Sequence, residues 1–165
     1  MSATEAYDAI VIGAGQAGSP LSTELANAGW KTALVERAHV GGTCINEGCT
    51  PTKTMIASAR VAYLARRAAD YGVGTGPISI DMEKVRQRKR DIVKSFRGGN
   101  EQRIEDTEGL DLLMGEARFA GPKTVAVQLN EGGTRYLQAD KIFINTGARP
   151  RLPDLPGLQE VPYLD

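Results

Sequence analysis

The chain has 165 residues, a length that suits one compact domain with a hydrophobic core. Its 20 basic and 20 acidic side chains cancel, which argues against a general nucleic-acid-binding or membrane-surface role. The first residues lack the basic and apolar regions of a signal peptide, and no apolar run is long enough to cross a bilayer. We therefore expect a soluble protein of the reducing cytoplasm, where paired cysteines are more often catalytic than structural.

The first predicted elements are a β-strand, a helix and a second β-strand. Residues 7–12 form a short apolar run rich in β-branched side chains, typical of a buried parallel strand. A helix is expected from about residue 16 to 27 or 28, ended by Gly29, and a strand over 31–35 leads to Glu36. Pro20 is compatible with this helix because it falls in the first turn, whose N–H groups have no intrahelical partners.

Gly13, Gly15 and Gly18 have the spacing of a dinucleotide-binding turn. Gly13 permits the tight turn, Gly15 lets a pyrophosphate approach the backbone, and Gly18 lets the helix pack closely on the strand. The start of the helix offers N–H donors and positive potential to phosphates. Glu36, 18 residues after Gly18, is placed to accept hydrogen bonds from ribose hydroxyls. This fingerprint by itself does not distinguish FAD from NAD.

Residues 41–53 read GGTCINEGCTPTK and contain the two cysteines of the chain, Cys44 and Cys49. Gly48 gives the backbone freedom to curl so that the two thiols meet. Proline favours the first position of a helix, so Pro51 predicts a helix capped by Thr50. Cys49 then lies at the mouth of that helix, where the peptide dipoles stabilise a thiolate. The pair is thus suited to thiol–disulfide exchange.

Two other uses of the cysteines stay open at this point. A structural disulfide would enclose only four residues and so would constrain little of the unfolded chain. A zinc site formed with His39 would lack a fourth ligand. His39 itself is expected in a surface loop, without a role as a base.

The thirteen residues from 41 to 53 resemble the redox-active motif of the class I flavoprotein disulfide reductases, which are FAD-dependent pyridine nucleotide–disulfide oxidoreductases. The chain is most similar to members such as mercuric reductase and dihydrolipoyl dehydrogenase. The resemblance implies that Cys44 exchanges with substrate and that Cys49 contacts the flavin. It also assigns the first nucleotide site to FAD. The FAD contacts that it implies in this stretch are Gly42, Thr43 and Lys53, the last near the flavin ring.

Two long helical segments are expected after the motif. The first, over 54–70, has apolar residues available for an inner face: Met55, Ile56, Ala59, Ala62, Tyr63 and Leu64. A loop over 71–77 leads to a second helix, which Asp81 caps and Gly98-Gly99 breaks, and a short polar helical piece follows to Thr107. The second helix carries seven basic residues from Lys84 to Arg97, which we interpret as a solvated surface rather than a docking face for an anionic partner.

The last third of the chain is predicted to be mainly strands, over 112–114, 116–119, 124–129 and 134–137. A further apolar strand begins at Lys141 and runs into Thr146-Gly147. This strand and turn resemble the second FAD-contacting motif of the same family, and Ala117 corresponds to a backbone position near the adenine. We therefore predict an α/β fold, a Rossmann-like FAD-binding domain with a parallel sheet, helices and a small antiparallel β-meander.

Residues 1–150 are expected to form the first segment of this domain, and residues 151–165 a proline-rich connector towards an NAD(P)H-binding domain. The resemblance implies a homodimeric full-length parent in which electrons pass from NAD(P)H through FAD to the Cys44–Cys49 disulfide and on to a small-molecule disulfide or a metal ion. The fragment alone is expected to bind FAD weakly and to lack turnover. The alternatives are a non-catalytic nucleotide-binding or interaction module and a flavin monooxygenase relative, which has no need of the cysteine motif.

Overall fold

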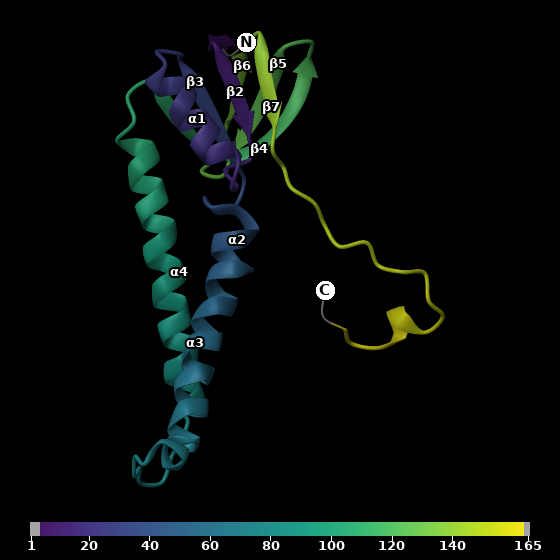
Figure 1. Ribbon diagram of the computed structural model, residues 1–165. Coiled ribbons are helices and arrows are strands. Elements are labelled where there is room, and N and C mark those ends of the chain that lie inside the picture. The colour runs from purple at the N-terminus through teal and green to yellow at the C-terminus, as the bar shows by residue number, and fades with distance from the viewer. Residues whose placement is uncertain (1–3, 164–165) are drawn as a thin grey trace.

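The computed structural model describes residues 4–163 and comprises a seven-stranded sheet, two long helices that extend away from it, and an extended carboxyl-terminal tail (Figure 1). The strands are β1 (Thr4–Ala6), β2 (Ala9–Ile12), β3 (Thr32–Glu36), β4 (Leu110–Gly121), β5 (Thr124–Leu129), β6 (Thr134–Gln138) and β7 (Lys141–Ile144). The α-helices are α1 (Gly18–Asn27), α2 (Gly42–Asn46), α3 (Cys49–Arg66) and α4 (Met82–Glu105), and the short 3₁₀ helices are η1 (Ala68–Tyr71) and η2 (Leu158–Glu160).

The sheet has the strand order β1-β6-β5-β4-β3-β2-β7. β7, β2, β3 and the first half of β4 are parallel to one another, whereas β4, β5 and β6 form an antiparallel meander. β1 adds to the meander as a parallel partner of β6. The predicted combination of a parallel sheet, helices and a small antiparallel meander is confirmed.

Alternate residues of the central strands are buried on opposite faces of the sheet, as the two-residue period of a strand requires. On one face Ile10, Ala33 and Val35 pack with residues of the meander, among them Val125 and Leu137. The other face is covered by α1 and α4 and has its own buried cluster: Val11, Ala14, Ala26, Leu34, Val40, Ile104 and Leu110. Because both faces are covered, β2 and β3 read as continuous apolar runs in the sequence.

The long strand β4 corrects the prediction of two separate strands on either side of Gly115. The strand is continuous, and it changes partner at this glycine, from β3 before it to β5 after it. A Cβ at Gly115 would overlap the backbone oxygen of Gln128, so the glycine permits a close approach of two strands. Gly115 does not end the strand.

The helix α4 is continuous through Gly98-Gly99, so the predicted break and the separate polar piece after it are wrong. Each glycine costs a helix interior about 1 kcal/mol relative to alanine. The buried side chains of Val93 and Ile104 hold the helix on either side of the pair, and this packing outweighs the local cost. The predicted cap is present, because the Asp81 carboxylate accepts hydrogen bonds from the N–H groups of Glu83 and Lys84.

The apolar residues predicted to form an inner face of the first long helix are mostly exposed. α3 lies against α4, and the pair extends away from the sheet (Figure 1), so only Thr54 is fully buried on this helix. Met55, Ile56, Tyr63 and Leu64 are between 39% and 59% exposed. The pattern of apolar residues correctly predicts a helix, but it does not place this face in the core of the described chain.

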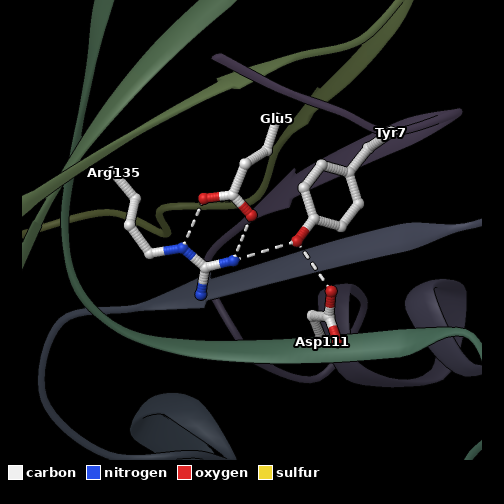
Figure 2. Close-up of polar contacts among 4 residues, drawn as sticks. All are labelled: Glu5, Tyr7, Asp111 and Arg135. Atoms are coloured by element: carbon white, nitrogen blue, oxygen red, sulfur yellow. Dashed lines mark hydrogen bonds and ion pairs between the residues drawn. The ribbon is translucent and has the colours of Figure 1, made fainter. Parts of the chain in front are cut away.

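Four polar side chains form a partly buried network across the meander and the edge of the parallel sheet (Figure 2). The Tyr7 hydroxyl donates a hydrogen bond to the Asp111 carboxylate over 2.6 Å. Arg135 donates from Nε and Nη2 to the two carboxylate oxygens of Glu5 and from Nη2 to the Tyr7 hydroxyl. The hydrogen bonds from Arg135 lower the pKa of Glu5. The network joins β1, β4, β6 and the link between β1 and β2.

Replacing Tyr7 with phenylalanine is expected to lower the free energy of unfolding at neutral pH by about 1–2 kcal/mol, because Asp111 then loses its buried donor. Burial and the hydrogen bond to Asp111 raise the pKa of Tyr7 above its ordinary value of 10.0. The stabilisation by the Tyr7 hydroxyl is present in full below pH 10. It is lost as the pH rises through the pKa of Tyr7 in the folded state, since the fold favours the protonated phenol. In urea unfolding, the difference in the free energy of unfolding between parent and variant should therefore become smaller above pH 10. Tyr136→Phe, at a site that is 37% exposed, is the control, and an equal loss there would contradict the prediction.

The described tail from Pro150 to Tyr163 is mostly exposed and extended, with η2 as its only helical turn. It leaves the sheet after β7 (Figure 1). The predicted connector over 151–165 includes two final residues that lie outside the described part. Within residues 4–163, no helix combines the length and apolar character needed to cross a membrane.

Candidate functional site

The glycine-rich turn lies where β2 ends and α1 begins. Gly13 has a φ of +103°, a backbone conformation that favours glycine, and its N–H donates to Val35 over 2.7 Å. A Cβ at Gly13 would overlap the backbone oxygen of Asn145 as the chain leaves β7, and the Thr146 nitrogen would be 3.3 Å away. The turn is therefore confined between the carboxyl ends of β3 and β7.

The third glycine of the fingerprint brings α1 directly onto this turn. A Cβ at Gly18 would overlap the carbonyl oxygen of Gly13 and lie 2.7 Å from Nδ2 of Asn145. Helix α1 has no side-chain cap on its N-cap residue Ala17 and no acidic residue in its first turn. Its positive end is thus left without a neutralising side chain of its own.

The carboxylate of Glu36 faces the turn from the end of β3. Oε2 accepts a hydrogen bond from the N–H of Ala14 over 2.9 Å, and Oε1 accepts one from the N–H of Ala38 over 2.8 Å. An ionised carboxylate has about four acceptor sites. Glu36 is therefore oriented by the backbone and keeps capacity to accept further hydrogen bonds.

Asn145 is a site residue that the sequence reasoning did not identify. It follows β7, and its Nδ2 donates to the Gly13 carbonyl over 3.0 Å while its own N–H donates to Ile12 over 2.8 Å. The side chain thus fixes the carbonyl at the centre of the turn. The sequence feature that could have indicated Asn145 is its position between a predicted strand and Thr146-Gly147, because a short polar side chain at a strand end can bind neighbouring backbone.

The cysteine motif folds as two helices rather than as a loop before one helix. Cys44 lies on α2, and Cys49 is the first residue of α3, directly after the N-cap Gly48. The predicted cap at Thr50, with Pro51 in first position, is therefore wrong: the helix begins at Cys49 and Pro51 is its third residue. The first turn of a helix leaves four N–H groups unpaired, so proline fits several of its positions.

The two cysteines are close together, because a Cβ at Gly48, directly before Cys49, would lie 3.8 Å from the Cα of Cys44, and both thiols are free. The neighbouring Cys49 thiol raises the pKa of the Cys44 thiol, and partial desolvation acts in the same direction. Lys53 is close enough for its positive charge to oppose this effect. Cys44 is half-buried, whereas Cys49 is exposed. The motif therefore holds two free thiols close together near the surface.

The cysteine-bearing helix α2 touches the glycine-rich turn. Gly41, with a φ of +98°, donates its N–H to Ala14 over 2.8 Å. Gly42, with a φ of +60°, packs so closely that a Cβ there would lie 2.8 Å from the Cα of Gly15. This contact brings the two sequence motifs to the same edge of the sheet, below the carboxyl ends of β2 and β3 in Figure 1.

The structure thus gathers most of the predicted site residues in one region. Gly13, Gly15, Gly18, Glu36, Gly42, Thr43, Cys44, Cys49, Lys53 and Thr146 lie on or directly beside the glycine turn and the two motif helices. Gly147 follows Thr146 in an exposed turn with a φ of +74°. Ala117 is three residues beyond Met114, which pairs with Glu36, so it lies past the carboxyl end of β3. Within residues 4–163, the structure has no group of three or more His, Cys, Asp or Glu side chains that could hold a metal ion.

Comparison with known families identifies one match over nearly the whole chain. The family described as pyridine nucleotide-disulphide oxidoreductase matches residues 7–165.

Similar curated proteins include a mercuric reductase from Serratia marcescens, 37% identical over 93% of this chain and 34% of that protein. The dihydrolipoyl dehydrogenase of Bacillus subtilis is 36% identical, over 95% of this chain and 34% of that protein. Among solved structures, the Cu(II) complex of the HOCl-induced flavoprotein disulfide reductase RclA from Escherichia coli superposes with a TM-score of 0.75 at 35% identity. It covers 96% of this chain and 32% of that one. The chain therefore spans about a third of the length of these relatives.

Proposed function

Because the chain belongs to the pyridine nucleotide-disulphide oxidoreductase family, we propose that it is the amino-terminal, FAD-binding part of a flavoprotein disulfide reductase. Cys44 and Cys49 are its redox-active pair. The observation that carries the proposal is the closeness of the two free cysteines at the end of the sheet where the glycine-rich turn lies: a Cβ at Gly48, directly before Cys49, would be 3.8 Å from the Cα of Cys44. A structural pair would have no need of that location.

The residues around the turn fit a dinucleotide. Gly13 and Gly18 leave no space for side chains where the backbone must bind a diphosphate, and the uncapped start of α1 favours an anion. Glu36 has acceptor capacity left for ribose hydroxyls. On the basis of the family resemblance we assign further FAD contacts to Gly15, Gly42, Thr43, Lys53, Ala117, Thr146 and Gly147.

The cysteine pair carries the exchange with substrate. Bound FAD supplies two-electron transfer from NAD(P)H. In the reduced pair, the thiolate of Cys44 attacks one sulfur of a substrate disulfide, and one substrate thiol leaves. Cys49 then attacks Cys44, which closes the Cys44–Cys49 bond, releases the second substrate thiol and leaves the pair oxidised. A disulfide or a metal ion such as mercuric ion, on which the named relatives act, is the proposed substrate class.

The remaining parts of the proposed function concern the whole protein. We propose that residues 1–150 are the first segment of the FAD-binding domain and that residues 151–165 connect it to an NAD(P)H-binding domain. The intact protein is proposed to be a cytoplasmic homodimer, as the family resemblance implies. The 165-residue chain by itself is proposed to lack NAD(P)H-dependent turnover.

Counting the free thiols of the purified chain tests the redox proposal. After exposure to air, a native chain should have almost no thiol that reacts with an aromatic disulfide reagent, and brief treatment with dithiothreitol should release both thiols, because the fold already holds the two cysteines close together. An intact mass measurement checks that the oxidised form is a monomer with an internal disulfide. Two thiols that stay reduced in air and react only after unfolding would instead support the non-catalytic nucleotide-binding module. The visible absorption spectrum of the same sample shows whether flavin is retained.

A further inference from the structure

Helix α2, which carries Cys44, depends on contacts with the rest of the protein for its position. It has only five residues, from Gly42 to Asn46, and a helix this short is not stable in water without tertiary contacts. Its single buried side chain is that of Ile45, which packs against Gly41. The other strong anchor is polar and lies at the carboxyl end of the helix, two residues after Cys44.

That anchor is the side-chain amide of Asn46. Its Nδ2 donates to the carbonyl oxygens of Val40 and Gly42 over 3.0 and 2.9 Å, and so ties the end of α2 to the chain that precedes Cys44. Its Oδ1 accepts a hydrogen bond from Nε of Arg97 over 2.8 Å. Both N–H groups and the carbonyl of the amide are therefore engaged. Because only the oxygen can face a guanidinium, Arg97 fixes which way the amide is turned.

Arg97 comes from α4, 51 residues further along the chain. It is half-buried, whereas most of the basic residues that precede it on this helix are exposed. The interpretation of the basic helix as a solvated surface therefore does not apply to Arg97. It does not apply fully to Arg88 either, whose Nη1 donates to the backbone oxygen of Thr54 on α3 over 3.1 Å. Arg88 joins α4 to α3, and Arg97 joins α4 to α2, the helix that carries Cys44.

We propose that Arg97 is a positioning residue for the redox pair, acting through Asn46 to hold α2 so that the Cys44 sulfur stays beside Cys49. This inference rests on the proposed function of the two cysteines. When a small-molecule disulfide oxidises the pair, the two thiols lose two protons and two electrons, the Cys44–Cys49 bond forms, and the oxidant becomes two thiols. A fixed α2 raises the effective concentration of one sulfur at the other and so favours the closed disulfide.

Three variants of the 165-residue chain test this role. Arg97→Met keeps a stem of similar length and removes the donor. Arg97→Gln removes the charge but carries an amide nitrogen the same number of bonds from Cα as Nε of arginine. Arg88→Met removes a link between α4 and α3 that does not touch α2, and serves as the matched control. Far-UV circular dichroism checks that each variant is folded.

The measurement is the equilibrium constant for forming the Cys44–Cys49 disulfide in glutathione buffers, together with hydrogen exchange of the α2 amides. Arg97→Met should lower the constant about tenfold and speed α2 exchange by a similar factor, as loss of one charge-assisted hydrogen bond predicts. Arg97→Gln should restore both to within about threefold of the parent, because it retains a neutral amide donor and a neutral hydrogen bond is roughly half as strong as a charge-assisted one. Arg88→Met should leave both unchanged, because it does not touch α2.

Each other outcome overturns the proposal. An unchanged constant and unchanged exchange in Arg97→Met would remove the positioning role. An equal effect in Arg88→Met would mean that loosening the α3–α4 pair is enough, and failure of Arg97→Gln to restore either readout would mean that the donor is not what matters. A parent chain that never forms the disulfide would contradict the proposed function, and α2 exchange would then decide the role of Arg97 alone.

Discussion

Replacing Gly18 with alanine is expected to lower the free energy of unfolding by at least about 3 kcal/mol, enough to unfold much of a marginally stable domain. The added methyl group would overlap the carbonyl oxygen of Gly13 and crowd Nδ2 of Asn145 at 2.7 Å. Backbone atoms of the turn cannot move aside as the end of a long side chain can. α1 must therefore shift off β2, and the packing of the face that α1 covers is lost with it.

Glycines in the middle of α4 provide the matched control for this prediction. Nothing lies within 4 Å of a Cβ built at Gly98 or Gly99, and neither has a positive φ. Alanine at either position should raise the free energy of unfolding by about 0.5–1 kcal/mol, since it favours the helix and restricts the unfolded chain. Urea denaturation of the three variants gives both signs in one experiment. A Gly18→Ala chain as stable as the parent would mean that the turn and α1 are not in the close contact described.

The fingerprint and the cysteine motif could be predicted from the sequence because their requirements are local. Gly13 needs a positive φ and Gly18 needs contact with a residue only five positions earlier, and both demands are written in the spacing of neighbouring glycines. Cys44 and Cys49 likewise meet through a short turn. A local rule failed where packing overrode it: Gly98-Gly99 predicts a helix end, yet the buried residues of α4 on both sides keep the helix continuous.

The contacts that complete the site could not be predicted, because they join residues far apart in the chain. Asn145 binds Gly13 across 132 residues, and Arg97 binds Asn46 across 51. Arg97 has no signal of its own, since an arginine in a basic helix usually faces solvent. The place of Asn145 at a strand end indicates that its side chain can bind backbone, but not that it binds Gly13. The same reason explains the wrong inner face of α3: periodicity indicates which residues share a side of a helix, but what packs on that side depends on the tertiary fold.

Single-cysteine variants are expected to trap a mixed disulfide with glutathione that the parent chain does not accumulate. In the parent, the neighbouring thiol attacks the mixed disulfide and closes the Cys44–Cys49 bond, releasing glutathione. Cys44→Ser and Cys49→Ser each remove that second thiol, so the adduct should persist at least roughly 100-fold longer, in keeping with the high effective concentration of paired groups. Mass spectrometry of the intact chain after mixing with oxidised glutathione measures this directly.

The two variants should also differ from each other in how fast the adduct forms, because their remaining sulfurs differ in exposure. Cys49 is exposed and Cys44 half-buried, so in the 165-residue chain the adduct should form faster in Cys44→Ser than in Cys49→Ser. The neighbouring Cys49 thiol raises the pKa of Cys44, so at a given pH below that pKa the parent has less Cys44 thiolate than a Cys49→Ala chain. When alkylation of Cys44 is followed as the pH is raised, with peptide-resolved detection, it should therefore begin at a lower pH in Cys49→Ala than in the parent.

Added FAD tests the role proposed for Cys49. If Cys49 faces FAD as proposed, added FAD should slow modification of Cys49 and leave that of Cys44 unchanged. Equal protection of both would refute this assignment.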